Sequence, residues 1–294
     1  MKGLTSVRGL GEAELAALID RAVGYATAPK PEPVLTDRSV ATLFFERSTR
    51  TRLSFQLAAE RLGAHVLDLD PTTASTGKGE SLRDTVLTVS AIGADIFVVR
   101  HAEPGIPDLV ADWTGAPVVN AGDGTREHPT QALVDLVTLM QHFGALKGLR
   151  MGIVGDIRHS RVAGSLFHAM PTMGVDLTAI GPSEFLPTGN TDGVVVTTDL
   201  DAALEGLDVV YSLRVQIERG ASVSGSYATH YGLDARRAAL LSENAVVMHP
   251  GPLNRGVEIS DEVADGPRSL ILQQVANGVP VRMAVLASLE ESLV

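Results

Sequence analysis

Three arginines and three hydroxyl-bearing residues occupy six consecutive positions, Arg47 to Arg52. An apolar, strand-forming run at 39–45 precedes this segment, and residues 53–62 place leucines at helical spacing before Gly63. The segment is therefore predicted at a strand-to-helix turn, where backbone N–H groups and the positive end of the helix dipole attract phosphate. The simpler alternative is capping by Ser48 with solvated arginines, but a cap needs fewer polar groups than this. We favour an anion-binding site.

Polar clusters also follow other stretches that the pattern predicts as strands. They are Arg100 after 95–99, His128 to Gln131 after 117–120, Arg161 after 149–154, Arg214 with Gln216 after 209–213, and His249 to Arg255 after 245–248. The carboxyl ends of parallel strands lie along one edge of a sheet, so one cleft can collect such side chains. The sequence therefore predicts a locally positive cleft.

His128 stands before Pro129, a residue type that fits the first position of a helix. A helix start disfavours protonation of an imidazole, which leaves a neutral donor suited to polarising a carbonyl. From these residues alone, a purely structural cap is equally open. Lys78 lies between two glycines in a loop over 71–80, and the pattern of a phosphate-binding P-loop is missing there. A solvated lysine is the simplest interpretation of that loop.

The composition is that of a globular chain with two ordinary domains. It has 294 residues, 45% of them hydrophobic, and a formal net charge of −11. This charge argues against nucleic acid and anionic membranes as partners. The chain has no cysteine, and no uncharged apolar run approaches the about 18 residues of a membrane span. We expect a cytoplasmic protein without disulfides or thiol nucleophiles.

Three strings of residues resemble the aspartate and ornithine carbamoyltransferases. Ser48 to Arg52 after Phe44-Phe45-Glu46 resembles their carbamoyl phosphate signature, His128-Pro129-Thr130-Gln131 resembles their carbonyl-recognition motif, and Arg214-Val215-Gln216 resembles their Arg-x-Gln segment. The resemblance runs over nearly the whole sequence. It implies an α/β fold of two similar domains, each with a parallel sheet flanked by helices, joined by interdomain helices.

The resemblance also implies the domain boundaries. It gives a carbamoyl phosphate-binding domain at 1–132 plus 278–294 and an aspartate-binding domain at 133–277. The last helical region is expected to break at Gly278 and Pro280, which separate 269–277 from 281–293.

By resemblance, the first domain supplies most of the residues that bind carbamoyl phosphate. The implied set is Ser48, Thr49, Arg50, Thr51, Ser75, Arg100, His128, Gln131, Gly251 and Pro252. In this family the loop that matches Ser75 and Lys78 reaches the active site of a neighbouring subunit, so we expect a homotrimer with shared sites. Arg50, Thr51, His128 and Lys78 are the expected catalytic residues.

The remaining implied positions concern the second substrate. Lys78, Arg161, Arg214 and Gln216 would bind L-aspartate, whose α-amino group would take the carbamoyl group to give N-carbamoyl-L-aspartate and phosphate. This is an early step of de novo pyrimidine (UMP) biosynthesis. Positioning and electrostatics suffice for the transfer, so no metal or other cofactor is expected.

Two alternatives remain open. The first is an ornithine-type carbamoyltransferase, although that branch has a cysteine in the loop matching His249 to Pro252 and a Ser-Met-Gly loop for ornithine, and this chain has neither. The second is a carbamoyl phosphate-binding protein without catalysis on the same fold. A regulatory chain or a dihydroorotase is a possible further partner.

Overall fold

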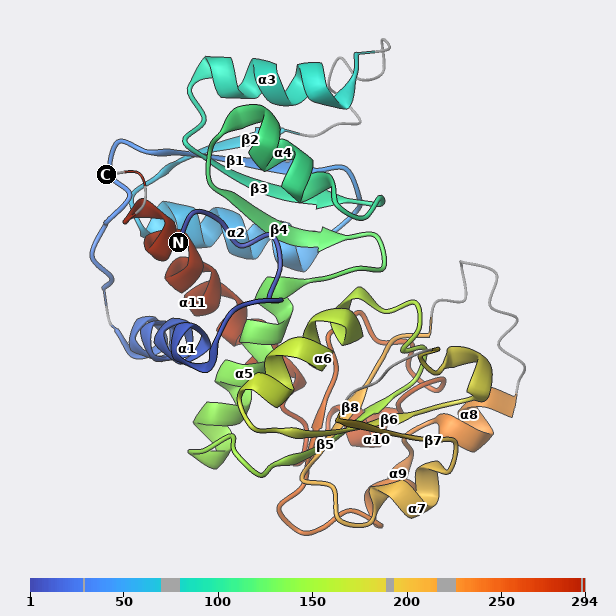
Figure 1. The fold of residues 1–294 in the computed structure, drawn as a ribbon. Helices are drawn as coiled ribbons and strands as arrows, with labels where there is room; N and C mark the ends of the chain where they lie inside the picture. The colour runs from blue at the N-terminus through green and yellow to red at the C-terminus, as the bar shows by residue number, and fades with distance from the viewer. Residues whose placement is uncertain (29, 70–79, 189–192, 216–225, 292, 294) are drawn as a thin grey trace. The chain divides into compact units, whose positions relative to one another are not determined.

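The computed structural model describes residues 1–294 apart from 29, 70–79, 189–192, 216–225, 292 and 294. The chain divides into two compact units (Figure 1), the first formed by 1–137 with 275–294 and the second by 138–274. Each unit contains one parallel sheet flanked by helices, which confirms the expected fold class. The boundaries that the resemblance implies are 132/133 and 277/278.

The first unit is built around a four-stranded sheet with the order β2-β1-β3-β4. Its strands are β1 (Ser39–Phe44), β2 (His65–Leu69), β3 (Ile96–His101) and β4 (Val118–Asp123), and its helices are α1 (Glu12–Thr27), α2 (Thr49–Arg61), α3 (Leu82–Ile92) and α4 (Ile106–Thr114). All neighbouring strands run parallel. The helices α5 (Pro129–Phe143) and α11 (Ile271–Glu290) each contain a unit boundary.

Both faces of this sheet are covered, and that explains why every residue of β1 after Ser39 is buried. Ala41 and Leu43 point to the face on which α3 and α4 contribute Val86 and Val110 to a common core. The helix α2 packs on β1 and β2, with Phe55 fully buried. Because α2 begins at Thr49, its first turn contains the hydroxyl and arginine residues that follow β1.

The second unit is built around a five-stranded parallel sheet with the order β7-β6-β5-β8-β9. Its strands are β5 (Arg150–Val154), β6 (Asp176–Ile180), β7 (Val194–Thr197), β8 (Val209–Ser212) and β9 (Val246–Met248), and its helical elements are α6 (Arg161–Thr172), η2 (Ser183–Phe185), α7 (Leu200–Leu204), α8 (Ser226–Tyr231), α9 (Ala235–Ala238) and α10 (Asp261–Ala264). The central strands β5 and β8 of this sheet are almost wholly buried.

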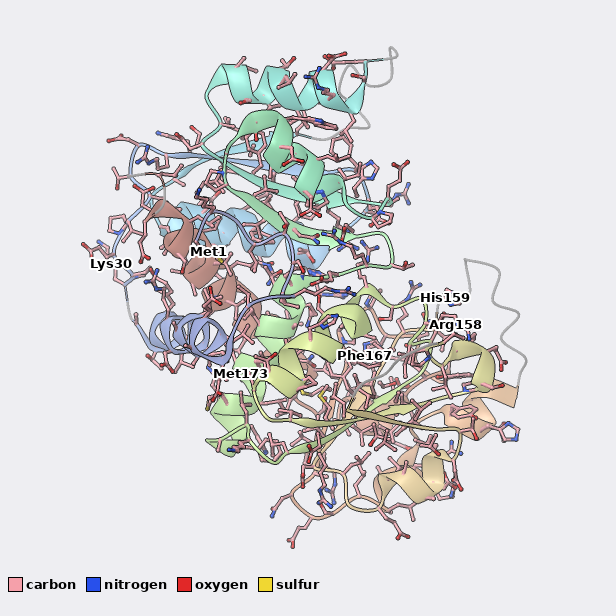
Figure 2. The ribbon with its side chains drawn as sticks, viewed as in Figure 1. Met1, Lys30, Arg158, His159, Phe167 and Met173 are labelled. Atoms are coloured by element: carbon pink, nitrogen blue, oxygen red, sulfur yellow. The ribbon has the colours of Figure 1, made fainter. Side chains whose placement is uncertain are left out.

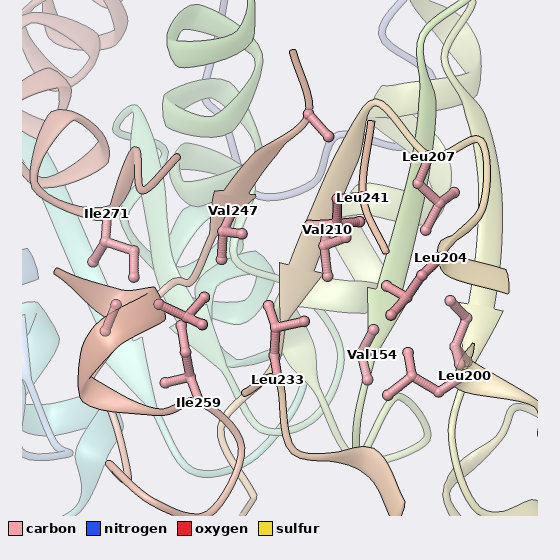
Figure 3. Packing of buried hydrophobic residues seen from close by; sticks show 14 residues of the cluster. Val154, Leu200, Leu204, Leu207, Val210, Leu233, Leu241, Val247, Ile259 and Ile271 are labelled. Carbon is pink, nitrogen blue, oxygen red and sulfur yellow. The ribbon is translucent and has the colours of Figure 1, made fainter. Parts of the chain in front are cut away.

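Buried aliphatic side chains fill one face of the second sheet (Figure 3). Val154, Val210 and Val247 come from β5, β8 and β9, and Leu204 and Leu207 pack over them. Gly152 in β5 makes room for this layer, because a Cβ atom there would lie 2.4 Å from a methyl carbon of Leu207. The core therefore holds together the three strands whose ends carry polar residues.

The expected break at Gly278 and Pro280 is wrong, because α11 runs as one helix from Ile271 to Glu290. Proline and glycine weaken a helix locally. In α11 the residues after Pro280 are largely buried, including Val285 and Leu289, and this tertiary packing outweighs the local preference. Gly278 has a separate use, since a Cβ atom there would lie 2.7 Å from the guanidinium of Arg282.

None of the helices in the described parts of the chain is both long enough and apolar enough to cross a membrane.

The contact between Gly152 and Leu207 gives a stability prediction. Gly152→Ala adds a methyl group into a filled space and should destabilise the second unit by about 1–3 kcal/mol, measured by chemical denaturation. Gly24→Ala is the matched control, because Gly24 lies in the exposed part of α1 with nothing within 4 Å of the added atom. The control should be neutral or stabilising by up to about 1 kcal/mol. Equal effects of the two changes would contradict this account of the core.

Candidate functional site

In the first unit, the candidate residues come from three neighbouring strands. The first turn of α2 follows β1, Arg100 lies near the end of β3, and His128 precedes α5 after β4. β1 and β3 are adjacent in the sheet, although β2 lies between them in the chain. This is the kind of switch point at which open parallel sheets bind ligands outside the carboxyl ends of their strands.

The start of α2 offers donors to an anion. Ser48 occupies the N-cap position with an extended backbone (φ −160°, ψ 106°), and its side chain makes no capping hydrogen bond. Thr51 is 7% exposed, whereas Arg50 is exposed. Desolvation of the Arg50 guanidinium by the surrounding protein lowers its pKa below the usual value. The turn therefore combines helix-dipole N–H groups, hydroxyl groups and a partly desolvated cation.

The third arginine of this segment has a structural partner. The Nε atom of Arg52 donates to Oδ1 of Asp68 on β2 at 3.0 Å, and its Nη2 atom contacts the other carboxylate oxygen. Thr42 donates to the same carboxylate at 2.7 Å. Burial raises the pKa of Asp68, but the hydrogen bonds from Arg52 and Thr42 outweigh it and leave the pKa below its usual value. Arg52 thus ties α2 to the sheet.

Arg100 is half-buried and is held by its own unit. Its Nη1 atom donates to the carbonyl oxygen of Ala121 at 3.1 Å, and its Nε atom lies 3.5 Å from Oε2 of Glu46. Glu46 stands between β1 and the first turn of α2. A phosphate bound at this turn would therefore compete with Glu46 for the guanidinium.

His128 is buried, with 5% of its surface exposed, at the start of α5. Its carbonyl oxygen accepts the backbone N–H of Gln131 at 2.9 Å, as expected for the residue before the first helical turn. The Gln131 side chain donates to Asp135 one turn further along at 2.9 Å. The sequence-based placement of His128 before the helix and Gln131 within its first turn is confirmed.

The segment before His128 is fixed by the N-terminus of the chain. Glu127 is 1% exposed, and its carboxylate accepts hydrogen bonds from Ser6 Oγ at 2.5 Å and from the backbone N–H of Val7 at 2.8 Å. Asp123 is also fully buried, and one of its carboxylate oxygens accepts the backbone N–H of Glu127 at 3.2 Å. These contacts hold the backbone on which the imidazole stands.

In the second unit, β5, β8 and β9 are adjacent and carry the other polar clusters. Arg161 is the first residue of α6, and Ser160 caps this helix by accepting the N–H of Ala163 at 3.2 Å. His159 lies in the turn before it (Figure 2). Its Nδ1 atom is 2.8 Å from Oδ1 of the buried Asp156. The Nε atom of Arg158 donates to the carbonyl oxygen of Leu186 at 3.0 Å.

Glu258 fixes the loop that follows β9. Its side chain is fully buried, and Oε1 accepts the backbone N–H of Asn254 at 2.5 Å and lies 3.2 Å from Nε2 of His249. Nδ1 of His249 accepts the N–H of Gly251 at 2.8 Å, so Nε2 carries the proton that is donated to Glu258. The loop thus contains a buried donor–acceptor chain.

The same loop also touches the end of β8. The side-chain amide of Asn254 donates to the carbonyl oxygen of Val215 at 2.9 Å, and Ser212 Oγ donates to the carbonyl oxygen of Glu258 at 3.3 Å. Arg214, half-buried, lies between these two contacts in the chain. Glu258 therefore supports both the loop with Gly251 and Pro252 and the backbone that carries Arg214.

Three expected site residues, Ser75, Lys78 and Gln216, lie outside the described residues. Among the residues that are described, no group of three His, Asp or Glu side chains could hold a metal ion. The structure adds Glu46, Glu127 and Glu258, which the sequence analysis did not single out. Glu46 and Glu127 lie directly beside polar strings and Glu258 lies shortly after one, which is the available signal, but their partners cannot be recognised from local pattern.

Two family descriptions match the chain. Residues 2–141 match the carbamoyl phosphate-binding domain of the aspartate/ornithine carbamoyltransferases, and residues 147–289 match their aspartate/ornithine-binding domain. The chain is 50% identical over 279 residues to the aspartate carbamoyltransferase catalytic subunit of Acidothermus cellulolyticus, covering 93% of this chain and 84% of that one. It is 48% identical over 299 residues to that of Gluconobacter oxydans, covering 98% and 96%.

Solved structures give the same family. Aspartate transcarbamoylase from Trypanosoma cruzi in complex with carbamoyl aspartate and phosphate has a TM-score of 0.89 and 32% identity, covering 98% of this chain and 95% of that one. Ornithine carbamoyltransferase from Thermus thermophilus also has a TM-score of 0.89, with 29% identity and coverage of 98% and 99%. The two parallel sheets, the polar ends of their central strands and these matches together show that the chain belongs to the aspartate/ornithine carbamoyltransferase family.

Proposed function

We propose that this chain transfers the carbamoyl group of carbamoyl phosphate to the α-amino group of L-aspartate. The observation that carries this proposal is the pair Arg161 and Arg214, which follow the adjacent strands β5 and β8 of the second unit. Aspartate presents two carboxylates, and a planar guanidinium binds a carboxylate with two parallel hydrogen bonds. Ornithine would instead need acceptors for its side-chain ammonium.

Relatives support aspartate over ornithine as the acceptor. The sequences at 48–50% identity are named aspartate carbamoyltransferase catalytic subunits. The overall fold does not separate the two branches, since one structure of each kind gives the same TM-score of 0.89. The choice of acceptor therefore depends on side chains in the second unit.

The reaction forms one C–N bond and breaks one C–O bond. The amino nitrogen of aspartate attacks the carbonyl carbon, negative charge grows on the carbonyl oxygen, and phosphate leaves and takes up the amine proton. In our proposal Arg50, Thr51 and His128 donate to that oxygen, and each donor of this kind is worth about 3 kcal/mol of barrier. Ser48, Thr49 and the start of α2 bind the phosphate group, because the dipole of the helix and its N–H groups attract an anion.

The other proposed contacts follow the family pattern. Arg100 and Gln131 would bind carbamoyl phosphate in the first unit, with Gly251 and Pro252 at its amino group. Ser75 and Lys78 from a neighbouring subunit, and Gln216 beside Arg214, would complete the substrate contacts. The homotrimer, the role in pyrimidine biosynthesis, the cytoplasmic location, and a regulatory chain or dihydroorotase as partner stay predictions, as does the domain division at 132/133 and 277/278.

The function is tested by phosphate release from carbamoyl phosphate by the purified chain. We expect release with L-aspartate and none above background with L-ornithine, with N-carbamoyl-L-aspartate identified by mass spectrometry. Release only with ornithine would contradict our reading of Arg161 and Arg214 while leaving the first unit as assigned. If neither amino acid supported release but the chain bound carbamoyl phosphate, the binding-protein alternative would replace the proposal.

Arg50 and Arg52 form a matched pair for mutation. Arg50→Ala should lower kcat about 10²–10³-fold with little change in the circular dichroism spectrum, because Arg50 is proposed to stabilise the transition state. Arg52→Ala removes the partly exposed ion pair with Asp68 and should cost about 1 kcal/mol or less of unfolding free energy. Its kcat should stay within about tenfold of the unchanged chain. A larger loss of kcat in Arg52→Ala than in Arg50→Ala would reverse the assignment.

Glu258 gives a test of the second unit. Glu258→Gln removes the charge that Asn254 and His249 hydrogen-bond to, so kcat/KM for aspartate should fall about 10–100-fold. Binding of inorganic phosphate, measured without aspartate, should stay within about twofold, because the residues proposed for it belong to the first unit. Glu262→Gln on the exposed side of α10 is the control and should change neither quantity. Loss of phosphate binding in Glu258→Gln would show general damage instead.

A further inference from the structure

Arg282 is a buried cation in the first unit that the mechanism above does not use. Only 4% of its surface is exposed, on the second half of α11. Its Nη1 atom donates to the carbonyl oxygen of Gly278 at 2.8 Å. Its Nε atom has no hydrogen-bond partner among the described residues. A buried guanidinium with an unsatisfied donor lowers the stability of a protein, so we asked what function could compensate for it.

The guanidinium lies against the helix that begins at the anion site. Its central carbon lies 5.0 Å from the ring centre of Phe55, which is fully buried in α2. α2 is the helix whose first turn contains Arg50 and Thr51. The contact is a cation–π interaction, which offsets part of the cost of burying the charge. Arg282 thus places a positive charge against the middle of α2, in the same unit as the first turn of that helix.

The surroundings disfavour this charge in the free protein. Burial and the positive charge of Arg100 together lower the pKa of Arg282 to about 9, while the negative charge of Asp135 acts in the opposite direction. A guanidinium still remains protonated near neutral pH. Two arginines therefore repel each other near the proposed phosphate site, and an arriving phosphate would relieve that repulsion.

We propose that Arg282 is a positioning residue of the phosphate site, whose buried charge strengthens the binding of a phosphoryl anion through Arg100 and the start of α2 without touching the substrate. This inference rests on the proposed function, because it takes the start of α2 to be where phosphate binds. Gly278 fits this role, since a Cβ atom there would lie 2.7 Å from Nη1 of Arg282 and the guanidinium would have to move.

The proposal predicts opposite effects on stability and on binding. A charge that is unfavourable in the phosphate-free protein and favourable when phosphate is bound raises the affinity for phosphate and lowers the stability of the phosphate-free protein. Replacing such a charge with an apolar side chain of similar size is commonly neutral or stabilising. A residue that serves packing alone would lower stability when replaced and leave phosphate affinity unchanged.

The test uses the full chain with inorganic phosphate as the probe. Phosphate affinity is measured by isothermal titration calorimetry, and the melting temperature is measured without phosphate. Arg282→Met should weaken phosphate binding about tenfold, within the range of known coupling between sites, while the phosphate-free melting temperature stays equal or rises. Phosphate binding within about twofold of the unchanged chain, or a lower phosphate-free melting temperature, would overturn the proposal.

Two further variants separate charge from packing. Arg282→Lys keeps the charge and loses the planar fork, so it should keep most of the phosphate affinity that Arg282→Met loses. Phe55→Leu removes the ring under the guanidinium and should lower stability while phosphate affinity stays within about threefold, because the expected cation–π contribution is small. If Arg282→Lys or Phe55→Leu weakens phosphate binding as much as Arg282→Met, packing accounts for the effect and the proposal fails.

Measurements on the unchanged chain separate a failure of this proposal from a failure of the proposed function. Its phosphate affinity and its competition with carbamoyl phosphate are measured first. If it binds no phosphate, the anion site at α2 is wrong and the role of Arg282 falls with it. If it binds phosphate and Arg282→Met binds equally well, only the role of Arg282 is rejected.

Discussion

The chain has a net charge of −11 but places several arginines after the carboxyl ends of parallel strands. The rest of the structure has to accommodate these positive charges. Arginines at such strand ends need partners before any anion arrives, and the first unit supplies carboxylates for them. Asp68 binds Arg52, and Glu46 lies 3.5 Å from Arg100. The difference between these two pairs is informative. The Asp68–Arg52 pair joins α2 to β2. The Glu46–Arg100 pair holds an arginine that, in our proposal, binds the phosphate group of the substrate.

Buried carboxylates also shape the backbone on which the proposed binding groups stand. Glu127 fastens the segment before His128 to Ser6 and Val7, about 120 residues earlier in the chain. Glu258 does the same for the loop after β9 and, through Asn254, for the end of β8. Each accepts a backbone N–H, and a buried carboxylate is stabilised by such charge-assisted bonds. Acidic residues beside the arginines thus serve positioning as well as charge balance.

The sequence predicted those parts of the fold that depend on neighbours in the chain. The turn at Ser48 and the start of α5 at Pro129 follow from local patterns, and both are confirmed. The break expected at Pro280 is wrong, because burial of the following half of α11 overrides a local signal. Glu127 was missed for a related reason. Its partners are brought to it by a bridge between Leu4 and Val119, which no spacing rule reveals.

The identity of the acceptor is a harder question than the fold, and the reason is physical. A backbone that resembles an ornithine and an aspartate carbamoyltransferase equally well, at a TM-score of 0.89 for each, cannot favour one amino acid by shape. Discrimination must come from the charge at a few positions, since an aspartate carboxylate and an ornithine ammonium demand opposite partners. In our proposal the arginines at 161 and 214 attract the carboxylate and repel the ammonium. Arg161 begins α6 after β5, Arg214 follows β8, and β5 and β8 are neighbours in the sheet, so the proposed charge preference depends on residues at the ends of regular elements of the second unit.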